Sequence, residues 1–190
     1  PAFEGAGMGC GRRAVDGAID HYFGNGEYTV IGNVAPDGLC GSGMVDFLAV
    51  ERAAGHLNEF GRIQPKNECF EIVPGVKIYE CDIEQLLKAK AAVWAGVRTL
   101  ESHVGGEARK IYLAGGFAQY LKLENAVRIG MLPERNYEIV GNTSLAGAAR
   151  LAVAPEIGVE MNALIDLPRE LPLNTLAGFE DNYIDGLLLP

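Results

Sequence analysis

Several common signatures of binding sites are missing from this 190-residue sequence. Its 4 cysteines include no CxxC pair and its 3 histidines are scattered, so the pattern indicates neither an iron–sulfur cluster nor a zinc site. No GxxxxGKS or GxxxxGKT segment is present, which excludes a Walker P-loop. No apolar run is long enough to span a bilayer, and the first residues do not resemble a signal peptide. We therefore expect no membrane association, and we interpret the cysteines as small buried residues in a reducing cytoplasm.

Positive charge is also scarce, because the formal net charge is -9. From Pro155 onward the chain has one basic residue, Arg169, and the acidic residues Glu156, Glu160, Asp166, Glu170, Glu180, Asp181 and Asp185. Phosphates of nucleic acids need a basic surface, so we expect no nucleic-acid partner. We interpret the acidic tail as a solvated surface, with docking of a basic partner as the alternative. Residue 1 is proline rather than methionine, so we expect the chain to be excised or processed from a longer one.

The most informative segment that is present covers residues 110–119. An apolar run of strand length stops at Gly115 and Gly116, and a helix-like stretch follows. Such a turn offers bare backbone N–H groups and a helix N-terminus, which suits close approach by a negatively charged nucleotide. The alternative is a tight turn whose glycines only supply positive φ.

The rest of the chain alternates strand and helix patterns, which predicts an α/β fold. We expect strands at 28–31, 69–73, 76–79, 110–114 and 137–140, and helices at about 12–21, 42–57, 82–104, 119–129 and 143–152. After Pro155 the pattern predicts extended, proline-punctuated pieces that fold back over the core. Two parts result: a nucleotide-binding lobe at 1–154 and an extended acidic tail at 155–190 that packs on it.

Two of the predicted helix starts contain candidate site residues. Ser42 is interpreted as a helix cap or as part of a backbone nest near a phosphate, because its neighbours do not fit the GxSxG pattern of a nucleophile. Asp82 and Gln85, three residues apart, fit a capping box at the clearest helix. Lys88 on the same helix is most simply a solvated side chain.

This order of elements resembles the back half of a ribonuclease-H-like domain from the superfamily of sugar kinases, actin and heat-shock chaperones. There a strand followed by a GG turn borders adenosine, as residues 111–118 would here, and a small-residue helix like 141–149 lies at the hinge between two lobes. Over nearly its whole length the chain also resembles the C-terminal ATPase domain of the reductive activators of corrinoid proteins. The matching stretches are PAFEGA (1–6), GLCGSGMVD (38–46), residues 82–92, LAGGF (113–117), residues 124–130 and VGN (140–142).

The resemblance implies a mixed sheet with helices on both faces, and ATP with Mg²⁺ as cofactor. Members of that family use ATP to drive electron transfer from an iron–sulfur cluster on an N-terminal domain to inactive cob(II)alamin of a corrinoid protein, which yields cob(I)alamin for methyl transfer. The family's phosphate loop, DxGTNGE, is absent from this sequence, as are the first lobe and the cluster domain, so the chain alone is not expected to hydrolyse ATP. The expected partner is a corrinoid protein, and a homodimer is left open. The alternatives are a non-catalytic protein-docking module with the same fold and, last, a small-molecule kinase lobe.

The resemblance also assigns candidate site residues. Those at the adenosine are Gly115, Gly116, Phe117 and Gln119, although Phe117 also fits a core aromatic residue at a helix start. Those on the helix that flanks adenine or ribose are Asp82, Gln85 and Lys88, for which helix capping is an equal alternative. Those facing the phosphates are Glu4, Gly41, Ser42 and Gly43. Ala118 stands where relatives often have glycine, which would tighten the turn, and no catalytic or metal-binding residue is assigned.

Overall fold

The first sheet is built around a β-hairpin near the N-terminus. The computed structural model describes residue 3 and residues 7–190 of the chain. Strands β1 (Ala18–Gly24) and β2 (Glu27–Val30) pair antiparallel, and β1 also pairs in parallel with the short β3 (Gly38–Leu39). Asn25 and Gly26 between the strands both have positive φ, as a two-residue hairpin turn requires. The helix predicted at 12–21 is therefore wrong, because this hairpin takes residues 18–24 into a strand.

Helix α1 (Gly41–Ala53) packs directly against this sheet after the short 3-10 turn η2 (Ile31–Asn33) and β3. A Cβ atom at Gly43 would clash with the backbone oxygen of Ile19, so glycine at this position lets α1 begin close against β1. Ten of the 13 residues of α1 are buried, Phe47 among them. The helix thus forms the centre of the hydrophobic core.

The hairpin of β4 (Cys69–Val73) and β5 (Val76–Tyr79) confirms the sequence prediction and leads into the long helix α2 (Glu80–Val104). This helix begins two residues earlier than predicted. Asp82 lies in its first turn and accepts a hydrogen bond from the backbone N–H of Tyr79 at 3.0 Å, so it does cap the helix, but without Gln85. Gly105 ends the helix in the left-handed conformation, as the sequence indicates.

A separate parallel pair, β6 (Ile111–Ala114) and β7 (Tyr137–Gly141), follows α2. The predicted helix at 119–129 is two short helices, α3 (Gly116–Tyr120) and α4 (Leu123–Arg128), because Leu121 is extended. Within the described residues the strands form three small sheets, so the α/β class is confirmed but the expected single mixed sheet is not. Only the sheet of β2, β1 and β3 is mixed.

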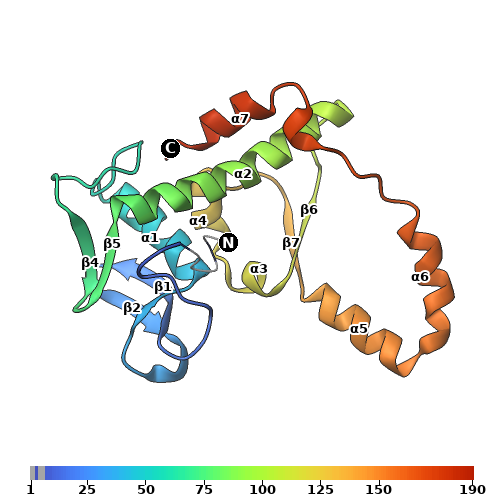
Figure 1. Cartoon of the computed structure of the whole chain (residues 1–190), viewed down its shortest axis with the longest axis horizontal. Helices are drawn as coiled ribbons and strands as arrows, with labels where there is room; N and C mark the ends of the chain where they lie inside the picture. The colour runs from blue at the N-terminus through green and yellow to red at the C-terminus, as the bar shows by residue number, and fades with distance from the viewer. Residues whose placement is uncertain (1–2, 4–6) are drawn as a thin grey trace.

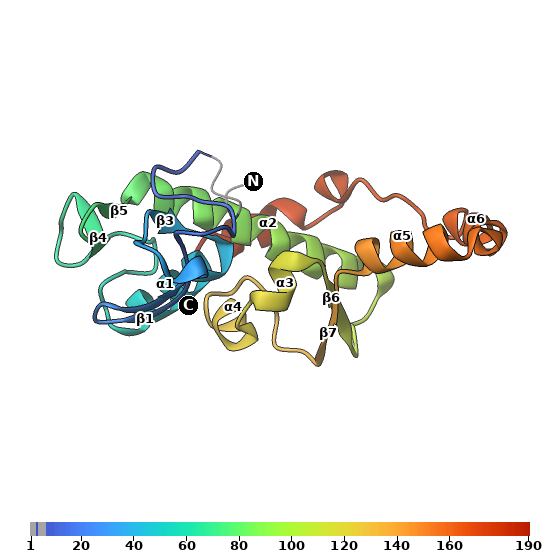
Figure 2. The ribbon, with the colours of Figure 1, turned by 90° about the horizontal axis from the view of Figure 1, so that it is seen from below.

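The C-terminal part is more helical than predicted. Helix α5 (Thr143–Val153) continues through the turn η3 (Pro155–Ile157) into α6 (Gly158–Ile165). Residues 143–172, here called the arm, extend away from the rest of the molecule (Figures 1 and 2). The chain returns through η4 (Leu173–Thr175) to α7 (Phe179–Gly186), which packs along α2. The prediction of an extended conformation for residues 155–190 is therefore wrong. Only the final part of this segment covers the core. The division of the chain at residue 154 stays a prediction.

Buried charge fixes the C-terminal end on α2. The side chain of Lys90 is fully buried, and its Nζ donates hydrogen bonds to the backbone oxygens of Gly186 at 2.5 Å and Leu188 at 2.6 Å. Arg52 Nε donates to the oxygen of Pro190 at 3.0 Å.

In the part of the chain that the structure describes, no helix has the length and apolar character needed to cross a membrane.

Candidate functional site

The corner between β6 and α3 is open. Gly115 has φ +103°, a conformation that favours glycine, and its N–H donates to the backbone oxygen of Gly141 at 2.8 Å. A Cβ atom added at either Gly115 or Gly116 would meet no atom of the described residues within 4 Å. Close packing inside the protein is therefore not the reason for Gly116, and the corner has room for a ligand beside the main chain.

This corner opens onto a cavity of about 710 Å³, within the range of about 300–1,000 Å³ typical of small-molecule sites. Its wall brings together the N-terminal segment, β1, the start of α1 and helix α3. The residues that line it are Phe3, Arg12, Arg13, Ala14, Asp20, Ile31, Cys40, Gly41, Ser42, Gly116, Phe117 and Tyr120. The sequence prediction had named Gly41, Ser42, Gly116 and Phe117 among these.

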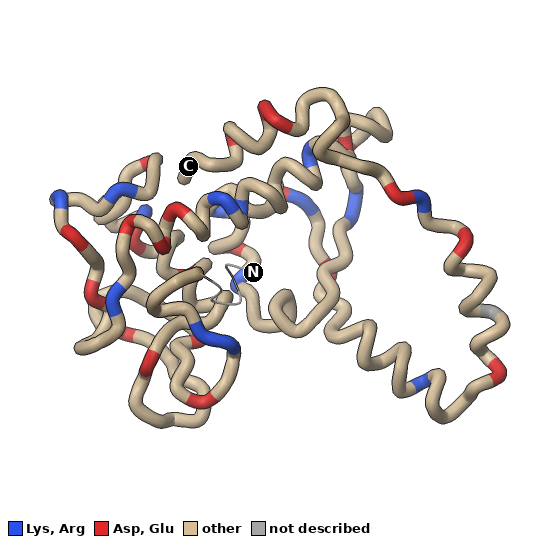
Figure 3. Tube along the Cα trace, in the orientation of Figure 1, with Lys and Arg blue, Asp and Glu red and all other residues tan. Residues whose placement is uncertain are grey.

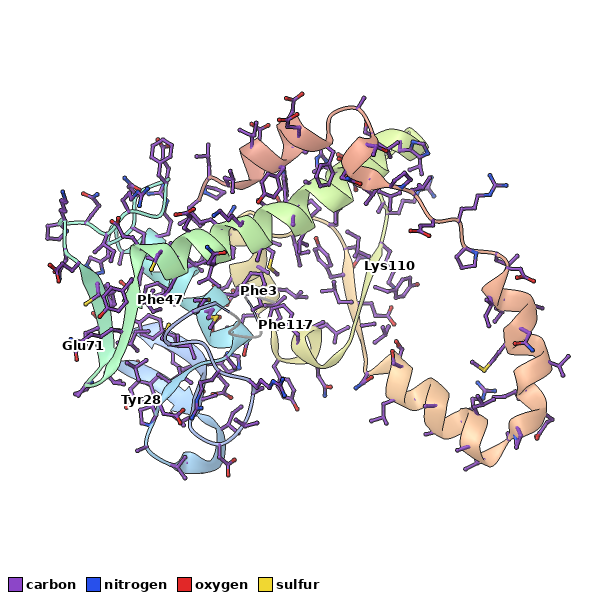
Figure 4. The ribbon with its side chains drawn as sticks, in the orientation of Figure 1. Phe3, Tyr28, Phe47, Glu71, Lys110 and Phe117 are labelled. Atoms are coloured by element: carbon purple, nitrogen blue, oxygen red, sulfur yellow. The ribbon has the colours of Figure 1, made fainter. Side chains whose placement is uncertain are left out.

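One side of the cavity is aromatic. The rings of Phe3 and Phe117 stack with centroids 5.5 Å apart, and Figure 4 shows the two side chains next to each other. A Cβ atom at Gly41 would lie 2.8 Å from the ring of Phe117, so the glycine leaves room for that ring against the start of α1. Phe117 is 41% exposed, so it is a cavity-lining residue and not the core aromatic of the alternative interpretation.

The cavity wall also has polar residues. Arg12 Nε donates to Asp37 Oδ1 at 2.8 Å, and the two side chains form an ion pair. Asp20 Oδ1 accepts hydrogen bonds from Thr29 Oγ1 at 2.6 Å and from the backbone N–H of His21 at 3.1 Å. The hydroxyl of Ser42 is buried 3.4 Å from the sulfur of Cys40. A ligand here would thus meet both aromatic rings and charged groups.

The remaining predicted residues lie away from the cavity wall. Asp82 is buried, and its carboxylate accepts hydrogen bonds from the backbone N–H of Gly9 at 3.1 Å and from that of Tyr79. Lys88 is exposed and pairs with Glu84 at 2.6 Å, while Gln85 is half-buried on the same helix. Gly115, Gln119 and Gly43 adjoin lining residues without lining the cavity themselves, and Glu4 lies outside the described residues. Their roles at a nucleotide stay predictions.

Two cysteines fit the expectation of small buried residues, and two do not. Cys10 and Cys40 are buried, Cys69 is half-buried and Cys81 is exposed. Burial, with a smaller contribution from the charge of Asp82, raises the pKa of Cys10 to about 12, so this thiol is neutral at physiological pH. Among residue 3 and residues 7–190, no group of three potential metal ligands comes together.

A buried carboxylate positions the segment after α3. Asp46 on α1 is fully buried and accepts a hydrogen bond from Asn125 Nδ2 at 2.6 Å, and its Oδ2 lies 3.1 Å from Lys122 Nζ and 2.9 Å from His21 Nδ1. Lys122 lies between α3 and α4, so this network anchors the cavity-lining helix α3 to α1 and β1. No local pattern in the sequence indicates this network, because its members are up to 104 positions apart.

Comparison with known proteins places this geometry in a family. A family model described as the C-terminal domain of RACo, the ASKHA domain, matches residues 1–190. The chain belongs to this family. The resemblance inferred from the sequence is therefore confirmed, and the RACo domain accounts for an α/β fold with small sheets.

Individual relatives of this RACo domain are named for corrinoid activation. The chain is 30% identical to the corrinoid activation enzyme RamQ of Eubacterium limosum, over 97% of this chain and 37% of the relative. It is also 30% identical to the [Co(II) methylated amine-specific corrinoid protein] reductase of Methanosarcina barkeri, over 80% of this chain and 34% of the relative. A solved structure, the reductive activator for corrinoid, iron-sulfur protein, covers all of this chain with a TM-score of 0.88 at 31% identity. The chain spans about a third of the length of these proteins.

Proposed function

We propose that this chain is the nucleotide-binding lobe of an ATP-dependent reductive activator, which returns cob(II)alamin of a corrinoid protein to cob(I)alamin in methyl-transfer metabolism. One observation carries the proposal: in a member of the RACo family, an unobstructed glycine corner opens onto a cavity of ligand size. The names of its relatives support the corrinoid protein as partner. The cytoplasmic location and a homodimer are part of the same proposal.

The residues of the cavity fit a nucleotide. The main chain at Gly116 allows an adenosine to lie flat against the corner, and the rings of Phe117 and Tyr120 offer apolar surface beside it. Asp20 is the carboxylate on the described part of the wall, and Mg²⁺ is commonly held by one or two carboxylates together with substrate phosphates. Bound ATP would supply the free energy that favours the electron-transferring state of the whole protein. The residues of this chain would bind and orient the nucleotide.

The substitution Gly116→Ala tests the proposal, because the structure separates its effects on folding and on binding. The added methyl group meets no protein atom, and alanine is favoured over glycine in helices by about 1 kcal/mol, so the melting temperature should stay the same or rise. The methyl group would occupy the space of the nucleoside. We expect the affinity for ATP with Mg²⁺, measured by titration calorimetry on the full-length protein, to fall by about tenfold or more.

Gly96→Ala in α2 is the matched control. Its Cβ would also have room, with Leu173 at 3.9 Å, and it does not line the cavity, so ATP affinity should not change. Unaltered affinity in Gly116→Ala would show that the nucleotide does not lie at this corner. Absence of any ATP binding by the natural protein, with retained binding to a corrinoid protein, would favour the docking-module alternative.

Activity gives the second test of the proposal. With reductant and a corrinoid protein, the full-length protein should remove the cob(II)alamin absorbance only when ATP is added. A decrease that does not depend on ATP would contradict the role of the lobe.

A further inference from the structure

The cavity contains two adjacent arginines that have different surroundings. Arg12 is held in place: its N–H donates to the backbone oxygen of Leu39 at 2.8 Å, and its guanidinium is paired with Asp37. The methylene part of its side chain lies across Gly38, where a Cβ atom would clash with it. The charge of Arg12 is therefore balanced, and its position is fixed by packing.

Arg13 lines the same cavity, but its guanidinium has no such partner. Its side chain is exposed, and it makes no hydrogen bond or ion pair with any other residue of the described chain. Its backbone is nevertheless fixed, because Arg12 on one side is anchored and the oxygen of Arg13 accepts a hydrogen bond from the N–H of Val15 at 2.9 Å. Among the described residues, Arg13 therefore presents to the cavity a guanidinium without a hydrogen-bond or ion-pair partner.

Asp20 on the same wall forms no hydrogen bond or ion pair with either arginine among the described residues. Its Oδ1 accepts hydrogen bonds from Thr29 Oγ1 and from the N–H of His21. The cavity wall thus combines a bare glycine corner, aromatic rings and the guanidinium of Arg13. A ligand that contacts the rings and this guanidinium has a flat, largely apolar part and an anionic part.

We propose that Arg13 binds the phosphate groups of the nucleotide and makes the cavity select nucleoside polyphosphates over nucleosides. This inference rests on the proposed function. The planar guanidinium donates two parallel hydrogen bonds to phosphate oxygens, an arrangement that lysine cannot reproduce. In a protein with a net charge of -9, such a local cation would favour the entry of an anionic ligand.

The test compares ATP and adenosine on the same full-length protein by titration calorimetry. Arg13→Ala should weaken ATP binding by about 10- to 100-fold, as expected for loss of a charge-assisted contact, and should leave adenosine affinity within about twofold. Arg13→Lys should fall between the natural protein and Arg13→Ala, because it keeps the charge without the fork. Arg109→Ala, an exposed arginine that does not line the cavity, is the matched control and should change neither affinity.

Each outcome decides between the two proposals. If the natural protein binds ATP and Arg13→Ala binds it equally well, the role of Arg13 is overturned while the proposed function stands. If Arg13→Ala loses adenosine as strongly as ATP, Arg13 acts on the shape of the cavity and the selectivity role is overturned. If the natural protein binds neither ligand, the proposed function itself fails, and the role of Arg13 with it.

Discussion

Residues 18–104 and the arm use their apolar side chains in opposite ways. Residues 18–104, here called the covered half, bury their apolar side chains between β1, α1, the β4–β5 hairpin and α2. In the arm, α5 has no buried residue. Six apolar side chains of the arm are between 61% and 83% exposed: Leu145, Val153, Val159, Leu164, Ile165 and Leu167. Figure 3 shows that acidic and basic positions also occur along this segment.

An apolar pattern in a sequence specifies which face of a helix or strand is apolar, but it does not specify what covers that face. Monomeric soluble proteins rarely leave large contiguous apolar surface exposed. The solved relative matches this chain over its whole length at a TM-score of 0.88, and this chain covers 35% of that protein. The covered half is stabilised by its own contacts, whereas the arm is held mainly by its connections to β7 and η4.

The largest expected effect contrasts one apolar residue from each region. Phe47 is fully buried and contacts the rings of Tyr22 and Phe70 at centroid distances of 5.8 and 5.4 Å (Figure 4). Phe47→Ala should lower the free energy of unfolding by about 3–5 kcal/mol. Leu164→Ala, at a residue that is 61% exposed, should change it by less than about 0.5 kcal/mol. Urea denaturation of the chain measures both, and equal losses would show that the arm is packed in solution.

The buried Lys90 of the covered half should make the free energy of unfolding depend on pH. Burial lowers the pKa of Lys90 from 10.5 to about 8. Between these two values the unfolded chain binds a proton that the folded chain does not, so stability should rise with pH over this window, by about 3 kcal/mol at most. Below pH 8 both states are protonated and the effect is absent. Lys90→Met should remove the rise when unfolding is measured from pH 7 to 10.5.

Lys88→Met on the same helix is the control, because Lys88 is exposed and should leave the rise intact. The raised pKa of Cys10 lowers the stability of the folded chain as pH rises above 9. This effect is the same in the natural chain and in both variants, so it cancels when they are compared. A rise that persists in Lys90→Met would contradict the assignment.

A smaller effect on stability is expected at the end of the covered half, next to the strands β6 and β7 that precede the arm. Glu101 near the end of α2 is buried and accepts hydrogen bonds from the N–H of Ala108 at 3.0 Å and from Arg98 at 3.1 Å, and it pairs with Arg135 before β7. Burial alone would raise the pKa of Glu101, but these hydrogen bonds and charges lower it below 4.5. Its contribution is therefore present above pH 4.5 and lost as pH falls through the folded-state value. Glu101→Gln should cost about 1.5–3 kcal/mol at pH 7, and the difference from the natural chain should vanish in acid.

Sequence patterns predicted the elements whose signals are local. The β4–β5 hairpin, the end of α2 at Gly105 and the strand before Gly115 follow from turn residues and apolar spacing. The Asn25–Gly26 turn is an equally local signal for the first hairpin, but the sequence interpretation assigned a helix to residues 12–21 instead. The break between α3 and α4 depends on Asp46, which holds Lys122 and Asn125 from another helix.

The candidate site was predictable only where backbone chemistry defines it. Two adjacent glycines after a strand indicate an open corner whatever the fold around it. Arg13, Asp20 and Tyr120 reach the cavity because residues 13–20 and helix α3, about 100 positions apart in the chain, meet there, and no local periodicity encodes such a meeting. For the same reason Lys88 and Gln85, on the helix that the resemblance suggested, lie outside the wall.

The hydrogen bond between Gly115 and Gly141 has a mechanical consequence. Gly141 is separated from the first residue of α5 by a single position, so this hydrogen bond links the base of the arm to the glycine corner beside the cavity. A movement of the arm relative to the rest of the molecule would shift the glycine corner or break this hydrogen bond. Binding of another molecule to α5 or α6 would in that way change the shape of the ligand cavity.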